Sequence, residues 1–366
     1  MPNYEARKRL KKKMLDRWEN EGGKIAADPT KAESGHRSRK GDRKRQLASH
    51  RTSKVGTQAA PTKKRKLTRA QAGAMKLLIA ADSATSVDVL IGAVGERPWP
   101  EGTTAQVLSV VADADVPEKL WREESYTKNA VSREMERRGQ QITAVAVPRL
   151  REVGMSAEVV VTRGDPRHLI SFFARKWSSD LIFIRAHVRK DYVHWMLGSV
   201  ARAIVATAPC TVQIVRDPIE GRTHTLDSAR KVLLATDGSE FSVEAAHALA
   251  ARPWPKGSEF KIVSVEEPWV IKPSGVKANK AVNSAEEVLA SAGLKAIGSV
   301  HSGKAKEVIL EEAQSWAADL IVVGSHGRRG LKRFLLGSVS EAVAMNAHCS
   351  VVVVRGSARR SRKAPT

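Results

Sequence analysis

The sequence has few of the features that mark disulfide-linked or membrane-spanning proteins. Its 366 residues include two cysteines, Cys210 and Cys349, whereas a disulfide framework needs several, so we expect a reducing compartment. No apolar run approaches the roughly 18 to 20 residues that cross a bilayer, and the first residues are charged rather than apolar. We therefore expect a soluble, cytoplasmic protein without membrane insertion, in which both cysteines are small buried side chains.

Acidic residues are scarce, and the excess of basic residues lies mainly at one end of the chain. There are 62 Lys and Arg against 39 Asp and Glu, which gives a net charge of +23. Residues 1–74 hold 22 of the basic and 7 of the acidic residues, so they account for +15 (22 − 7). Few large apolar residues follow Trp18 in this segment, so it cannot bury enough surface to fold by itself. We predict a mostly disordered basic extension at residues 1–73 and a basic tail at residues 358–366.

The remainder of the chain contains two self-similar blocks. Asp82 falls on Asp237 at an offset of 155 residues (237 − 82), and an Arg-Pro-Trp-Pro sequence recurs at the same offset. Farther along, the offset falls to 139, so the second copy is 16 residues shorter (155 − 139) between its second and third strands. Ordered matches with one clean deletion indicate a duplication. We place the repeats at residues 74–216 and 230–357, with a linker at 217–229.

Each repeat alternates short, continuously apolar runs with amphipathic ones. Continuously apolar strands are typical of parallel sheets that helices cover on both faces. The amphipathic runs carry apolar residues at three- and four-residue spacing, as Leu310, Ala313 and Trp316 illustrate. The sequence therefore predicts an α/β fold with two doubly wound, parallel five-stranded sheets in tandem.

Two strands of the second repeat end in residues suited to a nucleotide. The first ends in Ala235, Thr236 and Asp237, whose carboxylate could accept hydrogen bonds from ribose hydroxyls or cap the next helix. The fourth ends in a glycine-rich segment, in which we expect Gly324 and Gly327 to let the backbone turn and approach a pyrophosphate without a Cβ.

A helix is predicted to follow this glycine-rich segment. Nine residues separate Gly327 from Gly337, and four of them are basic. Gly337 and Ser338 open the helix, whose free N–H groups favour phosphate oxygens. Three glycines alone would be a weak signal, but their place between an apolar strand and a helix makes it strong.

This order of motifs resembles the ATP-binding branch of the universal stress protein family. The family signature G-x2-G-x9-G-(S/T) is matched by Gly324, Gly327, Gly337 and Ser338. The resemblance covers residues 74–357 and implies a Rossmann-like adenine nucleotide alpha hydrolase fold that binds ATP, with or without Mg²⁺. It implies that the backbone near Val265 reads adenine, that Asp237 holds ribose and that the glycine loop holds phosphates. The implied binding residues are Ala235, Thr236, Asp237, Val265, Val323, Gly324, His326, Gly327, Gly337, Ser338 and Val339.

The resemblance also implies an arrangement of the two repeats. Family members often pair through their last strands, so residues 210–216 and 349–355 are expected to lie antiparallel in a pseudo-dimer within one chain. Such pairing would cover the apolar edge of each strand. Association of whole chains into homo-oligomers is left open. Where the family shows Gly-Asp-Pro after the third strand, the second repeat has Gly303 and Lys304 instead, and we expect the same turn as at residues 164–166.

The first repeat departs from the phosphate motif. Arg185 and Val188 stand where the second repeat has Gly324 and Gly327, and both bring a Cβ and a long or branched side chain. The other equivalents are retained, namely Asp82, His187, Gly198 and Ser199. We therefore predict an empty or altered first site, with an anion at Arg185 as the less favoured alternative.

Catalysis is not expected to be the main activity. His326 has no set of acid, base and nucleophile around it, and the chain lacks a P-loop lysine and a kinase-type loop, so we predict no catalytic residue and no metal ligand. Slow ATP hydrolysis would be compatible with this. Nucleotidyl transfer usually needs a histidine pair at the first helix, which residues 239–242 lack. The sequence favours a stress-response sensor or signalling module.

A second hypothesis places the activity in the basic extension. Its basic runs at residues 8–13, 39–45 and 63–66 would bind nucleic acid with a steep salt dependence, with the repeats as a scaffold. A solvated tail and a chain that starts at Met75 are the alternatives. Few aromatic residues interrupt these runs, so base stacking by the extension has little support.

Overall fold

A computed structural model describes residues 73–95, 99–112, 128–186, 197–216, 230–252, 254–268, 275–327 and 336–356. The predictions for the basic extension, the linker and the basic tail therefore fall almost wholly outside the described residues. No helix among the described residues is long and apolar enough to cross a membrane.

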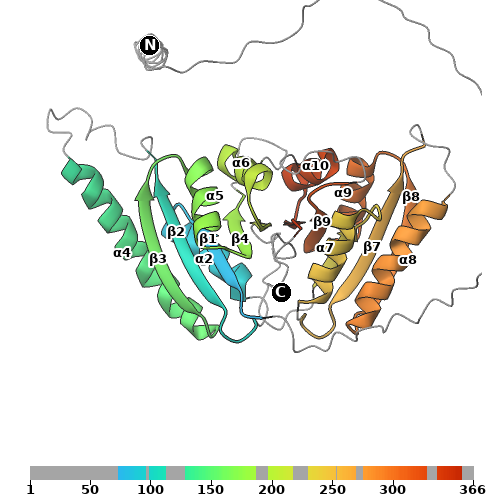
Figure 1. The fold of residues 1–366 in the computed structure, drawn as a ribbon, viewed down its shortest axis with the longest axis horizontal. Coiled ribbons are helices and arrows are strands. Elements are labelled where there is room, and N and C mark those ends of the chain that lie inside the picture. Colours follow the sequence, from blue (N-terminus) through green and yellow to red (C-terminus); the bar gives the residue numbers. More distant parts are fainter. Residues whose placement is uncertain are drawn as a thin grey trace, which may run out of the picture. The chain divides into compact units, whose positions relative to one another are not determined.

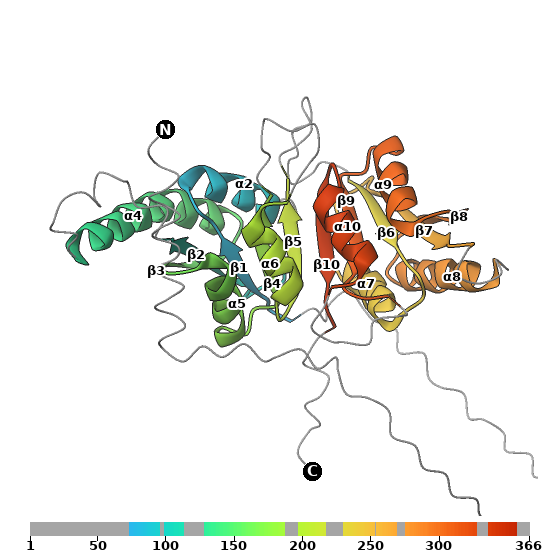
Figure 2. The same ribbon diagram turned by 90° about the horizontal axis from the view of Figure 1, so that it is seen from above.

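The first repeat alternates strands and helices as predicted (Figure 1). Its elements are β1 (Lys76–Ala80), α2 (Ala84–Gly95), β2 (Thr104–Val111), α4 (Lys128–Glu152), β3 (Ser156–Arg163), α5 (Pro166–Lys176), β4 (Leu181–Arg185), α6 (Ser199–Thr207) and β5 (Thr211–Val215). Helices α2 and α4 cover one face of the sheet, and α5 and α6 cover the other (Figure 2). This two-sided cover explains why β1 and β4 are buried almost throughout.

The second repeat has the same order of elements. They are β6 (Lys231–Ala235), α7 (Glu240–Ala250), β7 (Glu259–Glu266), α8 (Val276–Ser291), β8 (Ala296–Ser302), α9 (Ala305–Ser315), β9 (Leu320–Gly324), α10 (Ser338–Asn346) and β10 (Ser350–Val354). The predicted deletion lies in the crossover to the third strand. In the first repeat Glu158 lies opposite Gln106, and the two are 52 residues apart in the sequence. In the second repeat Ile297 lies opposite Lys261, 36 residues apart (297 − 261). The second crossover is therefore 16 residues shorter (52 − 36).

The two sheets join into one sheet of ten strands in the order β3-β2-β1-β4-β5-β10-β9-β6-β7-β8. All neighbours within a repeat are parallel, whereas β5 and β10 are antiparallel, which confirms the predicted pairing of the last strands. Gln213 lies opposite Val352, its own equivalent at the offset of 139, so this pair marks a pseudo-twofold axis. One core cluster continues through both repeats beneath α5, α6, α9 and α10.

The tryptophan of the repeated Arg-Pro-Trp-Pro sequence serves packing. The indole Nε1 of Trp99 donates to the Val94 carbonyl at 2.8 Å, and Trp254 donates to the Leu249 carbonyl at 3.0 Å. Each tryptophan also packs edge to face on a core phenylalanine, at 6.1 Å from Phe183 and 5.6 Å from Phe260. These contacts anchor the end of the first helix of each repeat on the sheet, which accounts for the tryptophan that both repeats share.

Two arginines link the repeats reciprocally. Arg216, after β5, donates to the carbonyls of Ala344 at 2.7 Å and Cys349 at 3.0 Å, at the C-terminal end of α10. Arg355, after β10, donates to the carbonyls of Val205 and Ala206 in α6, both at 2.7 Å. Each guanidinium therefore serves carbonyls at the end of the other repeat's last helix, where a cation is favoured by the helix dipole.

Candidate functional site

The predicted binding residues gather at one edge of the second sheet. Strand β6 lies between β9 and β7, and all three run parallel, so their carboxyl ends meet there. Ala235 ends β6, Val265 lies one residue before the end of β7, and Gly324 ends β9. Val323 is buried in the core, while Val339 is partly buried in the first turn of α10, so both contribute packing through their side chains.

Asp237 is held in the turn between β6 and α7. Its Oδ1 accepts a hydrogen bond from the Ser239 backbone N–H at 2.9 Å, and Gly238 adopts a positive φ of 74° in between. The alternative in which Asp237 caps the helix is wrong, because Ser239 is the N-cap residue and its hydroxyl accepts from the Ser242 N–H. The carboxylate is thus oriented by the backbone of the turn.

Gly327 brings the glycine loop against this carboxylate. A Cβ at Gly327 would lie 2.9 Å from Asp237 Oδ2, closer than real Cβ contacts come. The absence of a side chain therefore lets the loop and the carboxylate stand together. The segment at residues 328–335, with its four basic residues, lies outside the described residues.

Gly324 has a packing role that the sequence did not predict. A Cβ there would lie 2.7 Å from the carbonyl carbon and oxygen of Phe241 in the first turn of α7. The glycine is therefore needed for close contact between strand and helix, and its approach to a pyrophosphate stays a prediction. The Gly324 carbonyl accepts a hydrogen bond from Ser340 Oγ at 2.6 Å, which fixes α10 to the end of β9.

Gly337 joins the start of α10 to the end of the glycine loop. Its N–H donates to the Ser325 carbonyl at 2.8 Å, and a Cβ on it would lie 3.3 Å from the His326 Cα. Gly337 is the N-cap residue of α10 and supplies no side-chain cap. The helix therefore begins at Ser338 with backbone N–H groups and the positive end of its dipole at this edge, a combination that suits an anion.

His326 is packed rather than presented to solvent. The residue is 6% exposed, its ring centroid lies 4.9 Å from that of Phe241, and its Nδ1 lies 3.1 Å from Ser325 Oγ. The His326 carbonyl accepts from Ser239 Oγ at 3.3 Å. These contacts give His326 a role in fixing the glycine loop to α7.

Sequence reasoning missed three serines that hold the site together: Ser239, Ser242 and Ser340. Thr236 Oγ1 donates to Ser242 Oγ at 3.1 Å, and Ser242 Oγ donates to the Ser239 carbonyl at 3.0 Å. With the contacts already described, these bonds connect β6, α7 and the glycine loop. The available signal was Ser239 itself, because serine is a preferred N-cap residue directly before a helix.

Comparison with known proteins agrees with this geometry. The sequence profile of the universal stress protein family matches residues 73–216 and 228–355, which cover both repeats. The chain belongs to the universal stress protein family.

Individual relatives match single repeats or the tandem. A universal stress protein of Methanocaldococcus jannaschii is 37% identical over 142 residues, 34% of this chain and 82% of the relative. Universal stress protein YxiE of Bacillus subtilis is 30% identical over 145 residues, 34% of this chain and 98% of the relative. The crystal structure of a universal stress protein from Archaeoglobus fulgidus matches 76% of this chain and 98% of its own, with a TM-score of 0.58 and 20% identity, so it supports the fold alone.

The first repeat of this universal stress protein is built differently at the same edge. Three residues separate β1 from α2 but four separate β6 from α7, so α2 begins one position earlier and Ser83 stands where the second repeat has Gly238. Ser83 caps α2 through the Ser86 N–H and donates to Asp82 Oδ1 at 3.1 Å. Arg185 pairs with Val215 as Gly324 pairs with Val354, so it occupies the position where a Cβ would collide with a helix placed like α7. His187 and Val188 lie outside the described residues.

The turn after the third strand has the same backbone conformation in both repeats, but the helix that follows it is capped differently. Gly164 and Gly303 have similar positive φ values of 142° and 152°. In the first repeat Asp165 caps α5 by accepting from the Arg167 N–H at 2.9 Å. Lys304 offers no such cap to α9, and the Glu267 carboxylate accepts from the Ala305 N–H at 3.4 Å in its place.

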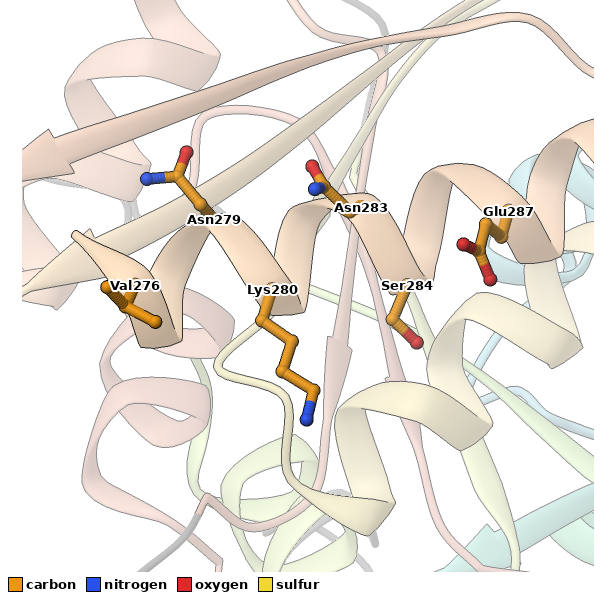
Figure 3. Close-up of a pocket in the computed structure, with 6 residues that line it drawn as sticks. All are labelled: Val276, Asn279, Lys280, Asn283, Ser284 and Glu287. Carbon is orange, nitrogen blue, oxygen red and sulfur yellow. The ribbon is translucent and has the colours of Figure 1, made fainter.

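No metal cluster accompanies the site within the described part of the chain. These residues include no group of three or more His, Cys, Asp or Glu that could hold a metal ion. A groove of about 640 Å³ lies elsewhere, along the outer face of α8 (Figure 3). It is lined by residues of that helix, Val276, Asn279, Lys280, Asn283, Ser284 and Glu287. Because one helix supplies the lining, the groove is an open surface feature.

Proposed function

We propose that the second repeat binds an adenine nucleotide, with ATP as the first candidate, and that the chain acts as a stress-response sensor or signalling module. One observation carries the proposal: the Asp237 carboxylate, Gly327 and the N-terminus of α10 meet at a single sheet edge. In doubly wound sheets ligands bind at the carboxyl ends of the strands.

Each part of a nucleotide has a chemically matched partner at this edge. The Asp237 carboxylate is oriented by the Ser239 N–H, so it can accept hydrogen bonds from ribose hydroxyls. Phosphate oxygens suit the start of α10, where Gly337 leaves the first turn without a side-chain cap. The end of β7 at Val265 is adjacent to β6 and is the proposed place for adenine.

The proposal assigns binding to the second repeat alone. In the first repeat the turn after β1 is one residue shorter, and Arg185 replaces Gly324. These differences change the position of the equivalent carboxylate, Asp82, relative to the next helix. Asp82 therefore offers a matched control within the same chain.

The test is nucleotide content and affinity of the purified full-length chain. The sample is denatured, released nucleotide is quantified, and the apo protein is then titrated with ATP, ADP and AMP, each with and without Mg²⁺. We expect about one adenine nucleotide per chain at saturation. Asp237→Ala should weaken binding by roughly 10- to 150-fold, because charged hydrogen bonds contribute about 1.5–3 kcal/mol. Asp82→Ala should leave the affinity unchanged.

Two results would contradict the proposal. Absence of nucleotide in the purified chain together with no binding on titration would exclude the function. Equal losses in Asp82→Ala and Asp237→Ala would show that the first repeat also binds, and would overturn the assignment to the second repeat.

A further inference from the structure

The outer face of α5 combines an exposed aromatic ring with basic residues. Phe172 is 52% exposed, which places it among the three exposed large hydrophobic residues of the described chain. His168 lies four residues before it, and Arg175 and Lys176 lie three and four residues after it, so all three neighbour Phe172 on one helix face. The sequence of α5 contains no acidic residue.

The aromatic ring is held in place from below. Phe172 packs edge to face on Phe173, with ring centroids 5.6 Å apart and an interplanar angle of 87°. Phe173 in turn packs against the core that runs through both repeats, and Lys176 Nζ lies 6.0 Å from its ring centroid. Phe172 is therefore a supported platform on the surface.

The second repeat shows what the fold requires of this helix. At the offset of 139, the inner faces of α5 and α9 match, since Ile170 and Ile309 are both buried, as are Ala174 and Ala313. The outer faces do not match: in place of His168, Phe172, Arg175 and Lys176, helix α9 carries Glu307, Glu311, Gln314 and Ser315. The same scaffold thus folds without the aromatic and basic face, so folding does not explain it.

Some of the basic side chains at the start of α5 are paired with a carboxylate of the same repeat. Arg167 pairs with the Asp165 carboxylate at 2.7 Å, and His168 Nδ1 lies 3.2 Å from the same carboxylate. Arg175 and Lys176 are exposed at the other end of the helix, beside Phe172. Their place in the last turn suits the helix dipole, but the dipole gives no reason for an exposed phenylalanine.

We propose that this face of α5 binds single-stranded nucleic acid, with phosphates at Arg175 and Lys176 and a base stacked on Phe172. The pairing of cations with an exposed ring matches the chemistry of unpaired strands, whose phosphates need positive charge and whose bases each have a stacking face. The net charge of +23 adds long-range attraction for such a polyanion. The inference does not depend on nucleotide binding by the second repeat.

The experiment measures fluorescence anisotropy of a labelled oligodeoxythymidine of about 16 nucleotides against the full-length chain over a range of salt concentrations. The variants are Phe172→Ala and the double substitution Arg175→Gln with Lys176→Ser, which installs the α9 residues. Glu311→Ala, at the position equivalent to Phe172, is the matched control. All variants keep the basic extension, so any binding by it is a common background. Circular dichroism melts check that each variant is folded.

The expected results separate stacking from charge. Phe172→Ala should weaken binding at least about fivefold with an unchanged salt slope, because stacking contributes about 1–3 kcal/mol per base. The double substitution should make the slope of log affinity against log salt shallower by about 1.4, at roughly 0.7 per phosphate contact. Glu311→Ala should bind like the natural chain. Wild-type affinity and slope in both α5 variants would overturn the proposal. Equally strong, Phe172-dependent binding of a polyglutamate peptide would also overturn it and assign the face to an acidic peptide.

Discussion

Replacement of Arg216 tests how strongly the repeats are joined. Arg216 is 5% exposed, and its guanidinium donates to the carbonyls of Ala344 at 2.7 Å and Cys349 at 3.0 Å. Burial lowers the pKa of Arg216 from 12.5 to about 10, so the group keeps its charge at neutral pH. This shift corresponds to about 3 kcal/mol of desolvation, which two charged hydrogen bonds of about 1.5–3 kcal/mol each roughly offset.

The stability lost when Arg216 is replaced should be larger than this small net contribution of desolvation and hydrogen bonds. Arg216→Met removes the guanidinium but leaves the carbonyls of Ala344 and Cys349 buried without that donor, at about 1–3 kcal/mol each. We expect the free energy of unfolding to fall by about 3 kcal/mol. Arg216→Lys should lose about half as much, because one ammonium can serve one carbonyl well but lacks the fork that reaches two.

Chemical denaturation followed by circular dichroism and tryptophan fluorescence measures these changes. Arg202→Ala is the control, since Arg202 pairs with Glu341 at 3.1 Å across the same interface but is 60% exposed, and it should change stability by less than about 1 kcal/mol. An Arg216→Met loss no larger than that of Arg202→Ala would refute the reasoning that the buried hydrogen bonds hold the repeats together.

Three further predictions concern the site, the cysteines and acid stability. Gly324→Ala should destabilise the chain by about 1–3 kcal/mol through collision with α7. Gly327→Ala should instead mainly weaken nucleotide binding by displacing Asp237. The reverse pattern in thermal melts and nucleotide titrations would contradict both roles. Burial raises the pKa of Cys210 and of Cys349 to about 12, so both thiols should resist iodoacetamide at pH 8 in the folded chain and react after unfolding, as mass spectrometry can show. The hydrogen bond from Arg167 lowers the pKa of Asp165 from 3.8 to about 2. The contribution of Asp165 to stability is therefore present above pH 3.8 and is lost as the pH falls through about 2. Asp165→Asn should flatten that part of the acid unfolding curve, and an unchanged curve would count against this role of the Asp165–Arg167 pair.

Periodicity and internal repetition were sufficient to predict the order of elements in each repeat. The alternation of strands and helices and the longer crossover of the first repeat follow from the matching blocks and their offsets. The antiparallel pairing of the last strands was instead implied by the family resemblance. The resemblance to the universal stress protein family rested on the glycine motif, whose spacing is a local property of the chain, and the match of the family profile to both repeats shows the membership.

Contacts between remote segments could not be predicted in this way. Arg216 reaches Ala344 across 128 residues, and no local pattern signals which carbonyl a buried arginine will meet. The packing role of Gly324 depends on how closely α7 approaches β9, which spacing does not reveal. The earlier start of α2 escaped notice because the offset of 155 holds both at Asp237 and again at the following tryptophan, so the two sequences align there without an insertion.

Helix α10 gives the first repeat a role in the second repeat's site. Its N-terminus begins at Gly337, beside the glycine loop, and the Arg216 side chain binds carbonyls at its other end. Arg202, also from the first repeat, pairs with Glu341 in the first turn of the same helix. A helix held at both ends keeps its N–H groups aimed at one place, and an anion site depends on that orientation. The first repeat has departed from the phosphate motif at Arg185 and yet supplies both of these contacts. The first repeat therefore supports the helix whose N-terminus forms part of the proposed site, whatever its own site binds.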